Sequence, residues 1–463
     1  MRKQFDYIVI GSGSAGKRAA IQASKLGQKV LLVEKHDIVG GVTVHTGTIP
    51  SKTLRETVLY LSGWRMRGFY GENYKVNHQI TADDLKQRLS VTLRHEVEVL
   101  EGQLMRNNVT IAHGLASFKS DKEVEVALNN GEKEVYKANK ILICAGTRPH
   151  KPADLPFDGK QVIDSDEILS LDTIPRSLLV YGAGVIGLEY ATIYNALDVD
   201  VTIIDGRDSM LGFVDREIMD EFTHHLRERG MNIRLGENIA EMYKRKDGKI
   251  QTKLDSGKTI VTELVLVAAG RQGLSDTLSL ENAGLSADKR GQISVNEFYQ
   301  TEVPHIYAAG DIIGFPSLAS TSMEQGRKAA CHAFNHKCTH QLDIFPYGIY
   351  SVPEISMVGL SEEDCKSKNI PYDIGVASFR EIARGQIMGL REGKLKIIFD
   401  LKEHKILGIH IVGEGATELV HIGQAVMAFG GTLDYFIDAV FNYPTLAEAY
   451  KIAALDGWNR THH

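Results

Sequence analysis

The chain has 463 residues, which is enough for roughly two to four domains at the usual ~150 residues each. Hydrophobic residues make up 43% and charged residues 24% of the chain, which excludes a mainly disordered protein. The formal net charge of −6 argues against a partner that is a nucleic acid, because such binders carry a basic surplus.

A strand, a glycine-rich turn and a helix follow one another twice along the chain. The first copy has an apolar strand at 7–10, the turn GSGSAG at 11–16, a helical pattern to about 26 and a strand that ends in Glu34. The second has a strand at 178–181, the turn GAGVIG at 182–187, a helix to about 197 and a strand that ends in Asp205. The first glycine and the acid are equally spaced in both copies.

One such motif is weak evidence, but two copies in the same context predict two dinucleotide-binding βαβ units. The first glycine makes the tight turn, the second lets a pyrophosphate approach the backbone, and the third lets helix and strand pack closely. The helix N-terminus favours phosphate, and the acid accepts hydrogen bonds from ribose. The competing interpretation is a pair of glycine turns without ligands. A triphosphate-binding loop at 11–17 is excluded, because Arg18 stands where a Mg²⁺-binding hydroxyl is required.

Further apolar strands end in small residues at Gly146, Gly270 and Gly310, the last followed by Asp311. We expect a first nucleotide domain at 1–150, a second at 151–272, a return to the first at 273–343 and a C-terminal domain at 344–463. The chain has four cysteines, and the apolar run at 7–10 is too short for the hydrophobic region of a signal peptide. It also has no run of 18 apolar residues. We therefore expect a cytoplasmic protein without a membrane partner.

The segment 40–52, GGVTVHTGTIPSK, resembles the signature of the FAD-dependent pyridine nucleotide-disulfide oxidoreductases, and the resemblance extends through Gly310-Asp311 to NYPTLAE at 442–448. It implies an α/β fold with two Rossmann-like domains and a C-terminal α+β domain that forms a homodimer. It also implies that the first unit binds FAD and the second binds NAD(P)(H), with Lys52 beside the flavin and paired with Glu189. As an isolated residue, Lys52 would be read as a surface lysine of a helix.

The site residues expected from motif and resemblance fall into three groups. The expected catalytic residues are Lys52 and Glu189. The expected FAD-binding residues are Gly11, Gly13, Ser14, Gly16, Glu34, Lys35, Gly41, Thr43, Thr48, Lys52, Gly146, Asp311 and Ala319. The expected NAD(P)-binding residues are Gly182, Gly184, Val185, Gly187, Glu189, Asp205, Arg207 and Gly270.

Three positions depart from the dithiol reductases of this family. Thr43 and Thr48 occupy the places of their two redox cysteines, and Tyr443 occupies the place of their histidine base. A hydroxyl cannot form a disulfide, and a tyrosine with a reference pKa of ~10 is a poor base at neutral pH. This pattern and the ending FNYPTLAEAY are similar to the soluble pyridine nucleotide transhydrogenase branch of the family.

We therefore expect an FAD enzyme that transfers hydride between NADPH and NAD⁺, with NAD(H) and NADP(H) alternating at one site. The alternative is a flavin NAD(P)H oxidase or diaphorase that reduces quinone or oxygen, and a less favoured one is a non-enzymatic nucleotide-binding protein. Asp205 favours NAD(H), whereas Arg207 would accept the 2′-phosphate of NADP(H).

Two remaining groups have competing interpretations. Cys331, His332, His336, Cys338 and His340 match no zinc spacing, and we interpret them as a solvated helix end, so no metal is expected. Tyr443 and Glu448 are either remnants at an interface or part of the substrate entrance and the dimer contact.

Overall fold

The computed structural model describes residues 3–71, 73–338 and 344–461. Contacts divide the chain into two compact units. The first unit comprises Met1–Thr53, Lys86–His150 and Gly270–His340, and the second comprises Leu54–Leu85, Lys151–Ala269 and Gln341–His463. The domain boundaries expected from the sequence remain predictions.

The first unit is built around a parallel sheet with β1 at its centre. β1 pairs in parallel with β2 and β5, β3 extends the sheet beyond β2, and β16 extends it beyond β5. β4 runs antiparallel to both β3 and β5. The bounds are β1 (Lys3–Ile10), β2 (Val30–Glu34), β3 (Thr110–Ser120), β4 (Glu123–Leu128), β5 (Lys133–Ile143) and β16 (Ile306–Ala308). Residues 7–10 are buried, as expected for an apolar run in a parallel strand covered on both faces.

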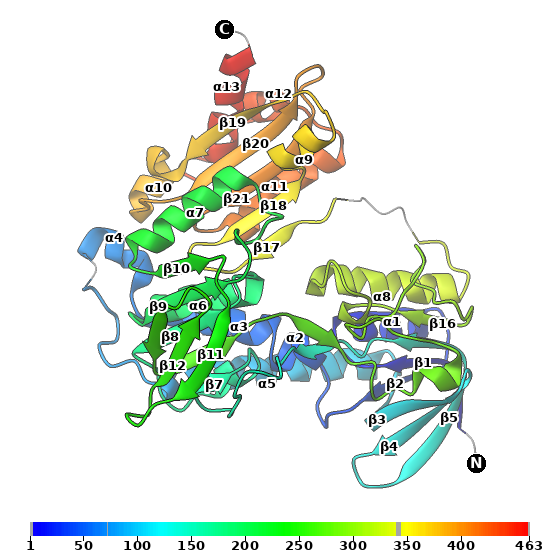
Figure 1. Cartoon of the computed structure of the whole chain (residues 1–463). Coiled ribbons are helices and arrows are strands. Elements are labelled where there is room, and N and C mark those ends of the chain that lie inside the picture. Colours follow the sequence, from blue (N-terminus) through cyan, green and yellow to red (C-terminus); the bar gives the residue numbers. More distant parts are fainter. Residues whose placement is uncertain (1–2, 72, 339–343, 462–463) are drawn as a thin grey trace. The chain divides into compact units, whose positions relative to one another are not determined.

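Two helices of the first unit, α1 (Ser14–Lys25) and α8 (Ala319–Ala333), pack against each other (Figure 1). Their contact is close because a Cβ atom added to Gly326 would lie 2.1 Å from the Ala15 carbonyl oxygen. The other elements are α2 (Gly41–His45), α3 (Thr48–Leu61), which continues into the second unit, α5 (Ala82–Arg106), which begins there, β6 (Thr147–Pro149), β15 (Arg271–Gly273), η3 (Leu280–Ala283) and η4 (Asp311–Ile313).

The second unit contains a second parallel sheet, in the order β10-β9-β8-β14-β7, and a three-stranded antiparallel sheet. The parallel strands are β7 (Val162–Ile163), β8 (Ser177–Tyr181), β9 (Asp200–Asp205), β10 (Asn232–Leu235) and β14 (Leu264–Val267). The antiparallel strands are β11 (Ile239–Lys244), β12 (Ile250–Leu254) and β13 (Thr259–Thr262). The helices are α4 (Arg67–Tyr70), α6 (Val185–Asn195) and α7 (Arg216–Glu228), with the 3-10 turns η1 (Trp64–Met66) and η2 (Glu167–Ser170).

The C-terminal part of the second unit is an antiparallel sheet in the order β17-β18-β21-β20-β19, against which α11 and α13 pack. Its strands are β17 (Tyr347–Ile349), β18 (Ile355–Gly359), β19 (Tyr372–Ser378), β20 (Lys394–Asp400) and β21 (Ile406–Val412). Its helices are α9 (Glu362–Ser367), α10 (Ala383–Met388), α11 (Ala416–Ala428), α12 (Leu433–Asp438) and α13 (Glu448–Thr461), with the turn η5 (Phe379–Glu381).

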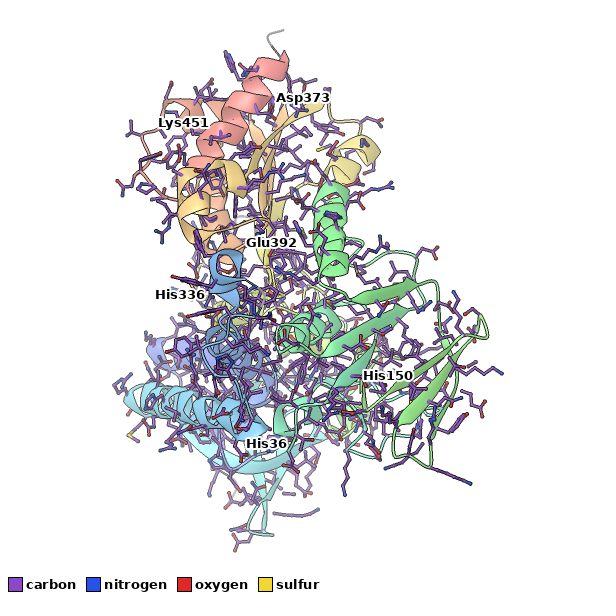
Figure 2. The ribbon with its side chains drawn as sticks, turned by 90° about the vertical axis from the view of Figure 1, so that its left-hand side faces the viewer. His36, His150, His336, Asp373, Glu392 and Lys451 are labelled. Atoms are coloured by element: carbon purple, nitrogen blue, oxygen red, sulfur yellow. The ribbon has the colours of Figure 1, made fainter. Side chains whose placement is uncertain are left out.

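Helix α7 is fixed to this C-terminal sheet at both of its ends. At the N-terminus, the Asp215 side chain caps the helix by accepting the Glu217 N–H at 3.1 Å. Just past the C-terminus, Arg229 forms an ion pair with Glu392, which is labelled in Figure 2, and stacks 4.0 Å over the ring centroid of Trp64. The Arg229 guanidinium therefore contacts both the Trp64 ring and the Glu392 carboxylate.

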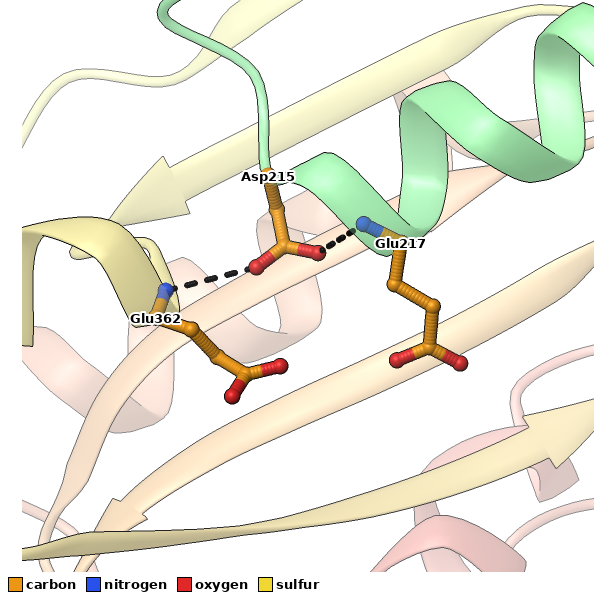
Figure 3. A group of neighbouring side chains, drawn as sticks. All are labelled: Asp215, Glu217 and Glu362. Atoms are coloured by element: carbon orange, nitrogen blue, oxygen red, sulfur yellow. Dashed lines mark hydrogen bonds between the residues drawn. The ribbon is translucent and has the colours of Figure 1, made fainter.

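The N-terminal end of α7 is held by a fully buried lysine of β20. The Lys396 ammonium contacts Asp215 at 2.9 Å, Glu217 at 3.0 Å and also Glu362, and Figure 3 shows these three carboxylates converging. Burial alone would lower the pKa of Lys396, but the hydrogen bonds that it donates to Glu362 and Asp215 outweigh this effect and the net pKa is raised. In the described part of the chain, these three carboxylates are the acidic group with metal-ligand geometry, and the Lys396 ammonium lies among them.

We expect Lys396→Met to lower the free energy of unfolding by ~3–5 kcal/mol, because it leaves buried carboxylates without their cation. The matched control is Lys405→Met, whose half-exposed ion pair with Glu403 should contribute less than ~1 kcal/mol. Thermal unfolding followed by circular dichroism compares the two variants. Equal melting temperatures would show that the carboxylates find other partners.

Candidate functional site

The first glycine turn leaves room for a ligand at only one of its three glycines. Gly11 has φ +101°, and a Cβ atom added there would lie 2.3 Å from the Cys144 carbonyl oxygen. A Cβ atom on Gly16 would lie 1.8 Å from the Gly11 oxygen, so α1 packs on the turn through backbone. A Cβ atom on Gly13 would meet nothing within 4 Å. The open space at the N-terminus of α1 fits a pyrophosphate.

The second glycine turn repeats this geometry. Gly182 has φ +113°, and its added Cβ would lie 2.4 Å from the Ala268 oxygen. A Cβ atom on Gly187 would lie 1.9 Å from the Gly182 oxygen, whereas one on Gly184 would meet nothing within 4 Å. Val185 begins α6, so a second helix N-terminus faces open space. Both turns therefore have the cradle that a dinucleotide requires.

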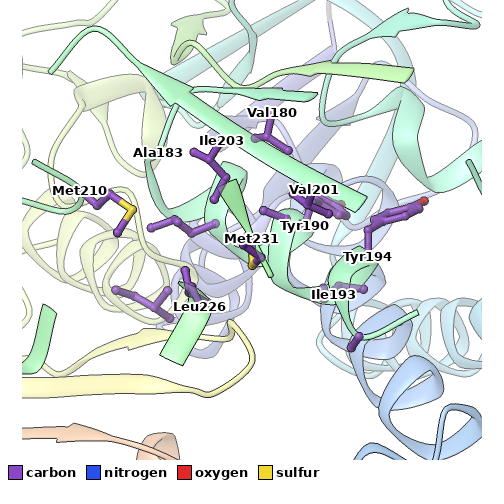
Figure 4. Packing of buried hydrophobic residues seen from close by; sticks show 14 of the residues in the cluster. Val180, Ala183, Tyr190, Ile193, Tyr194, Val201, Ile203, Met210, Leu226 and Met231 are labelled. Atoms are coloured by element: carbon purple, nitrogen blue, oxygen red, sulfur yellow. The ribbon is translucent and has the colours of Figure 1, made fainter. Parts of the chain in front are cut away.

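The core of the second unit fixes α6 against its sheet. Figure 4 shows Tyr190, Ile193 and Tyr194 of this helix packed among buried residues of β8 and β9, all at most 3% exposed. Because the helix is apolar on most of its surface, it stays buried and its N-terminus keeps its position relative to β8.

The two strand-end acids bind the glycine turns in the same way. One oxygen of Glu34 accepts the Ser12 N–H at 3.0 Å, and one oxygen of Asp205 accepts the Ala183 N–H at 2.7 Å. The Ser12 hydroxyl adds a 2.5 Å hydrogen bond to Glu34 and accepts the Gly40 N–H at 2.8 Å. Sequence reasoning missed Ser12, although its place directly after the first glycine was an available signal.

Arg207 forms a bidentate ion pair with Asp205. Its Nε and Nη2 donate to the two carboxylate oxygens at 2.9 and 2.7 Å, and its side chain remains 59% exposed. Burial alone would raise the pKa of Asp205, but the hydrogen bonds from Arg207 and Ala183 outweigh it and lower the net pKa. Asp205 is therefore ionised and preorganised, while Arg207 has solvent into which it can move.

The signature segment lies against the first glycine turn. A Cβ atom added to Gly41 would lie 2.8 Å from the Gly13 Cα, and the hydroxyls of Thr43 and Ser14 are 2.8 Å apart. Thr48 is the first residue of α3. The segment thus has hydroxyls at positions 43 and 48, where the dithiol reductases have cysteine sulfurs. The Thr43 hydroxyl is already hydrogen-bonded.

Lys52 and Glu189 belong to different compact units, so their pairing remains a prediction. The Lys52 ammonium donates to the Ser51 hydroxyl at 3.2 Å. Glu189 is 4% exposed and accepts the Tyr350 N–H at 2.9 Å. Each side chain thus has a hydrogen-bond partner within its own unit.

Asp311, an expected FAD ligand, is held among residues of the first unit. Burial raises the pKa of Asp311, against the effect of Arg271 and of the Thr147 hydroxyl, which lies 3.5 Å from its carboxylate. Gln325 of α8 accepts the Gly310 N–H at 2.9 Å and was not expected from sequence. Of the other expected FAD ligands, Lys35 is exposed, Ala319 begins α8, and Gly146 has a positive φ with open space at Cβ. Gly270, expected to bind NAD(P), also has a positive φ and open space at Cβ.

The residues with competing interpretations lie apart from these turns in the sequence and make other contacts. Tyr443 is 71% exposed, so its hydroxyl faces solvent in the single chain. His332 Nδ1 lies 3.0 Å from the Tyr307 hydroxyl, and its ring stacks on Phe298. His340 lies outside the described residues.

Comparisons with known proteins place these features in a family. Residues 5–326 match the profile described as pyridine nucleotide-disulphide oxidoreductase, and residues 345–454 match its dimerisation domain. A soluble pyridine nucleotide transhydrogenase of Mycobacterium tuberculosis (strain ATCC 25177 / H37Ra) is 48% identical over 459 residues, which cover 99% of this chain and 98% of that protein. One of Klebsiella pneumoniae is 43% identical over 460 residues, with 98% of each chain covered.

Two solved structures share the fold. RclA of Escherichia coli, described as an HOCl-induced flavoprotein disulfide reductase, aligns with a TM-score of 0.86 and 24% identity, covering 97% of this chain and 99% of that one. LpdA of Mycobacterium tuberculosis aligns with a TM-score of 0.88 and 23% identity over 97% and 99% of the two chains.

Two dinucleotide cradles on two parallel sheets define an oxidoreductase that uses two nucleotide cofactors. The chain belongs to the pyridine nucleotide-disulphide oxidoreductase family. The expected family, fold class, enzyme class and cofactors, FAD and NAD(P)(H), are thereby confirmed, and the dimerisation-domain match supports the expected homodimer. Among the described residues, no helix is long and apolar enough to cross a membrane.

We expect Gly184→Val to weaken pyridine-nucleotide binding by more than ~10-fold, because its side chain fills the open space at the second turn. FAD content should stay unchanged. The matched variant Gly13→Val should lose FAD instead, and neither added Cβ meets protein atoms within 4 Å. Flavin absorbance and nucleotide titration measure both effects. Loss of FAD from Gly184→Val would mean that the two cradles are assigned in reverse.

Proposed function

We propose that this chain is an FAD-dependent transhydrogenase that transfers hydride between NADPH and NAD⁺. The observation that carries the proposal is the combination of two dinucleotide cradles with a signature segment that contains Thr43 and Thr48 instead of thiols. The relatives that are 48% and 43% identical carry the name of this activity.

FAD, when bound, supplies the centre that accepts and releases hydride. In the proposal, the first cradle, around Gly13 and Glu34, holds its pyrophosphate and ribose. The second cradle, around Gly184 and Asp205, holds one nicotinamide nucleotide at a time, so donor and acceptor alternate there. Lys52 is proposed to place a positive charge at the flavin edge, where it would stabilise charge that develops during transfer.

Without a thiol relay, no residue of the signature segment can carry electrons to a disulfide substrate. In the described part of the chain, all four cysteines lie outside this segment, and Cys144, Cys331 and Cys365 are buried. The electrons must then leave through the site by which they entered. Four unbridged cysteines also support the finer proposal of a cytoplasmic location.

We expect NADPH to reduce thio-NAD⁺ under anaerobic conditions at a rate that alkylation of the NADPH-treated enzyme leaves within ~2-fold, because no thiol takes part in the transfer. Thio-NADH absorbance measures this turnover. Lipoamide and glutathione disulfide should not be reduced. Disulfide reduction that alkylation abolishes would overturn the proposal, and turnover with only quinone or oxygen would assign a diaphorase or an oxidase.

The Asp205–Arg207 pair is proposed to let one site accept both nucleotides. With NAD(H), the ribose hydroxyls would donate to the ionised Asp205, and with NADP(H), Arg207 would turn to the 2′-phosphate. Because Asp205 already accepts a backbone N–H at each oxygen, it keeps its position when Arg207 leaves. The 2′-phosphate would then replace the Asp205 carboxylate as the hydrogen-bond partner of the Arg207 guanidinium.

We expect Arg207→Ala to weaken NADP(H) binding by about 10- to 100-fold, the loss typical of a charge-assisted hydrogen bond. NAD(H) binding should be unchanged or tighter, because Asp205 loses a competitor. The control is Arg216→Ala on α7, a side chain that is 82% exposed and lies 3.8 Å from Asp220. Calorimetric titration gives both constants. An equal loss for both nucleotides would remove Arg207 from the 2′-phosphate site.

A further inference from the structure

The chain turns back on itself where α8 ends. Asn335 has φ +53°, and the His336 N–H donates to the Cys331 carbonyl oxygen at 2.8 Å. This is a left-handed helix cap, in which the chain reverses after the last turn. His336 is labelled in Figure 2. Lys337 and Cys338 therefore turn back toward the helix that precedes them.

The reversal brings a second cysteine to the helix. Arg327 Nη1 lies 3.8 Å from the Cys338 sulfur, and Arg327 and Cys331 share one face of α8 because they are four residues apart. Cys331 is 1% exposed, whereas Cys338 is partly exposed. Burial, and next a hydrogen bond with the Cys338 thiol, raise the pKa of Cys331 to about 12. The geometry therefore brings a buried thiol and a partly exposed thiol to the same side of α8, both beside Arg327.

The surroundings favour reaction at Cys338. Glu324 holds the other edge of Arg327, with Nε to carboxylate 2.8 Å and Nη2 to carboxylate 2.5 Å, so the guanidinium is fixed with Nη1 toward the sulfur. Cys338 is the partly exposed thiol of the pair, so a hydroperoxide can reach its sulfur. Cys331 remains a thiol beside it and is placed to resolve an oxidised Cys338.

A metal is not the better explanation for this pair. His332 directs Nδ1 to the Tyr307 hydroxyl. Among the described residues, a metal-like group needs three or more His, Cys, Asp or Glu side chains close together. The group that meets this condition is the carboxylate cluster around Lys396, and it does not include Cys331 or Cys338. Two thiols without a third ligand fall short of a structural zinc site.

We propose that Cys331 and Cys338 form a reversible disulfide when the protein meets a hydroperoxide. The Cys338 sulfur attacks an oxygen of the hydroperoxide, so that an S–O bond forms, the O–O bond breaks, and the leaving oxygen departs as water or an alcohol with the Cys338 thiol proton. The Cys331 sulfur then attacks the sulfur of the Cys338 sulfenic acid, an S–S bond forms, the S–O bond breaks, and the hydroxyl leaves as water with the Cys331 thiol proton. Two thiols are oxidised by two electrons and the hydroperoxide is reduced by two. A dithiol reductant reverses the change.

The test treats the native full-length protein with hydrogen peroxide, blocks the remaining thiols with iodoacetamide and digests with trypsin and a glutamate-specific protease without reduction. Cleavage after Lys337 and Glu354 separates Cys331, Cys338 and Cys365 onto different peptides. We expect the Cys331 and Cys338 peptides to be linked, and the link to disappear with dithiothreitol. Of the four thiols, Cys144 and Cys365 should remain free.

Two variants make the assignment specific. In Cys331→Ser, Cys338 should stop as a sulfenic acid that dimedone traps, while Cys365→Ser should form the link like the parent. Circular dichroism recorded alongside shows that the oxidised chain is folded. Three results would overturn the proposal. Cys338 could be oxidised only to sulfinic acid, the link could join two chains, or the link could form only after unfolding.

Discussion

At both glycine turns, a backbone carbonyl oxygen occupies the place where a side chain of the third glycine would begin. The added Cβ atoms of Gly16 and Gly187 would lie less than 2 Å from the oxygens of Gly11 and Gly182. This close approach sets each helix directly on its strand, and the helix N-terminus then points at the open space over the second glycine. Each turn also donates a backbone N–H to its strand-end acid, so the turn, the helix and the acid are fixed together.

The same scaffold separates binding from electron relay. Nothing in the cradles depends on sulfur, because their contacts are backbone N–H groups, carboxylates and space. The signature segment packs against the first cradle through Gly41, so its side chains can change from thiol to hydroxyl while the packing stays the same. A family built for disulfide chemistry can therefore lose that chemistry and still hold two nucleotides.

The sequence alone was sufficient to predict the elements that depend on short-range patterns. Glycine turns, strand-end acids and the helices between them follow from short-range patterns. The hydrogen bonds that Glu34 and Asp205 accept from the backbone of their glycine turns were not predicted, because the acids were expected to bind ribose. The carboxylates around Lys396 were not predicted, because residues 215, 217 and 362 meet it only through the tertiary fold. The sequence pattern predicted a helix end near residues 331–338, but the contact of Cys338 with Arg327 was missed, because that contact depends on the left-handed turn at Asn335.

The ion pairs at the two ends of α7 also limit how the second unit can move. Separating Lys396 from Asp215 would leave buried charges without a partner, so movement of the helix away from the C-terminal sheet would cost free energy. The loop from β9 to α7, which begins with Gly206 and Arg207, is therefore tethered at its far end. The proposed turn of Arg207 toward a 2′-phosphate would then move one side chain on a loop whose far end is attached to a held helix.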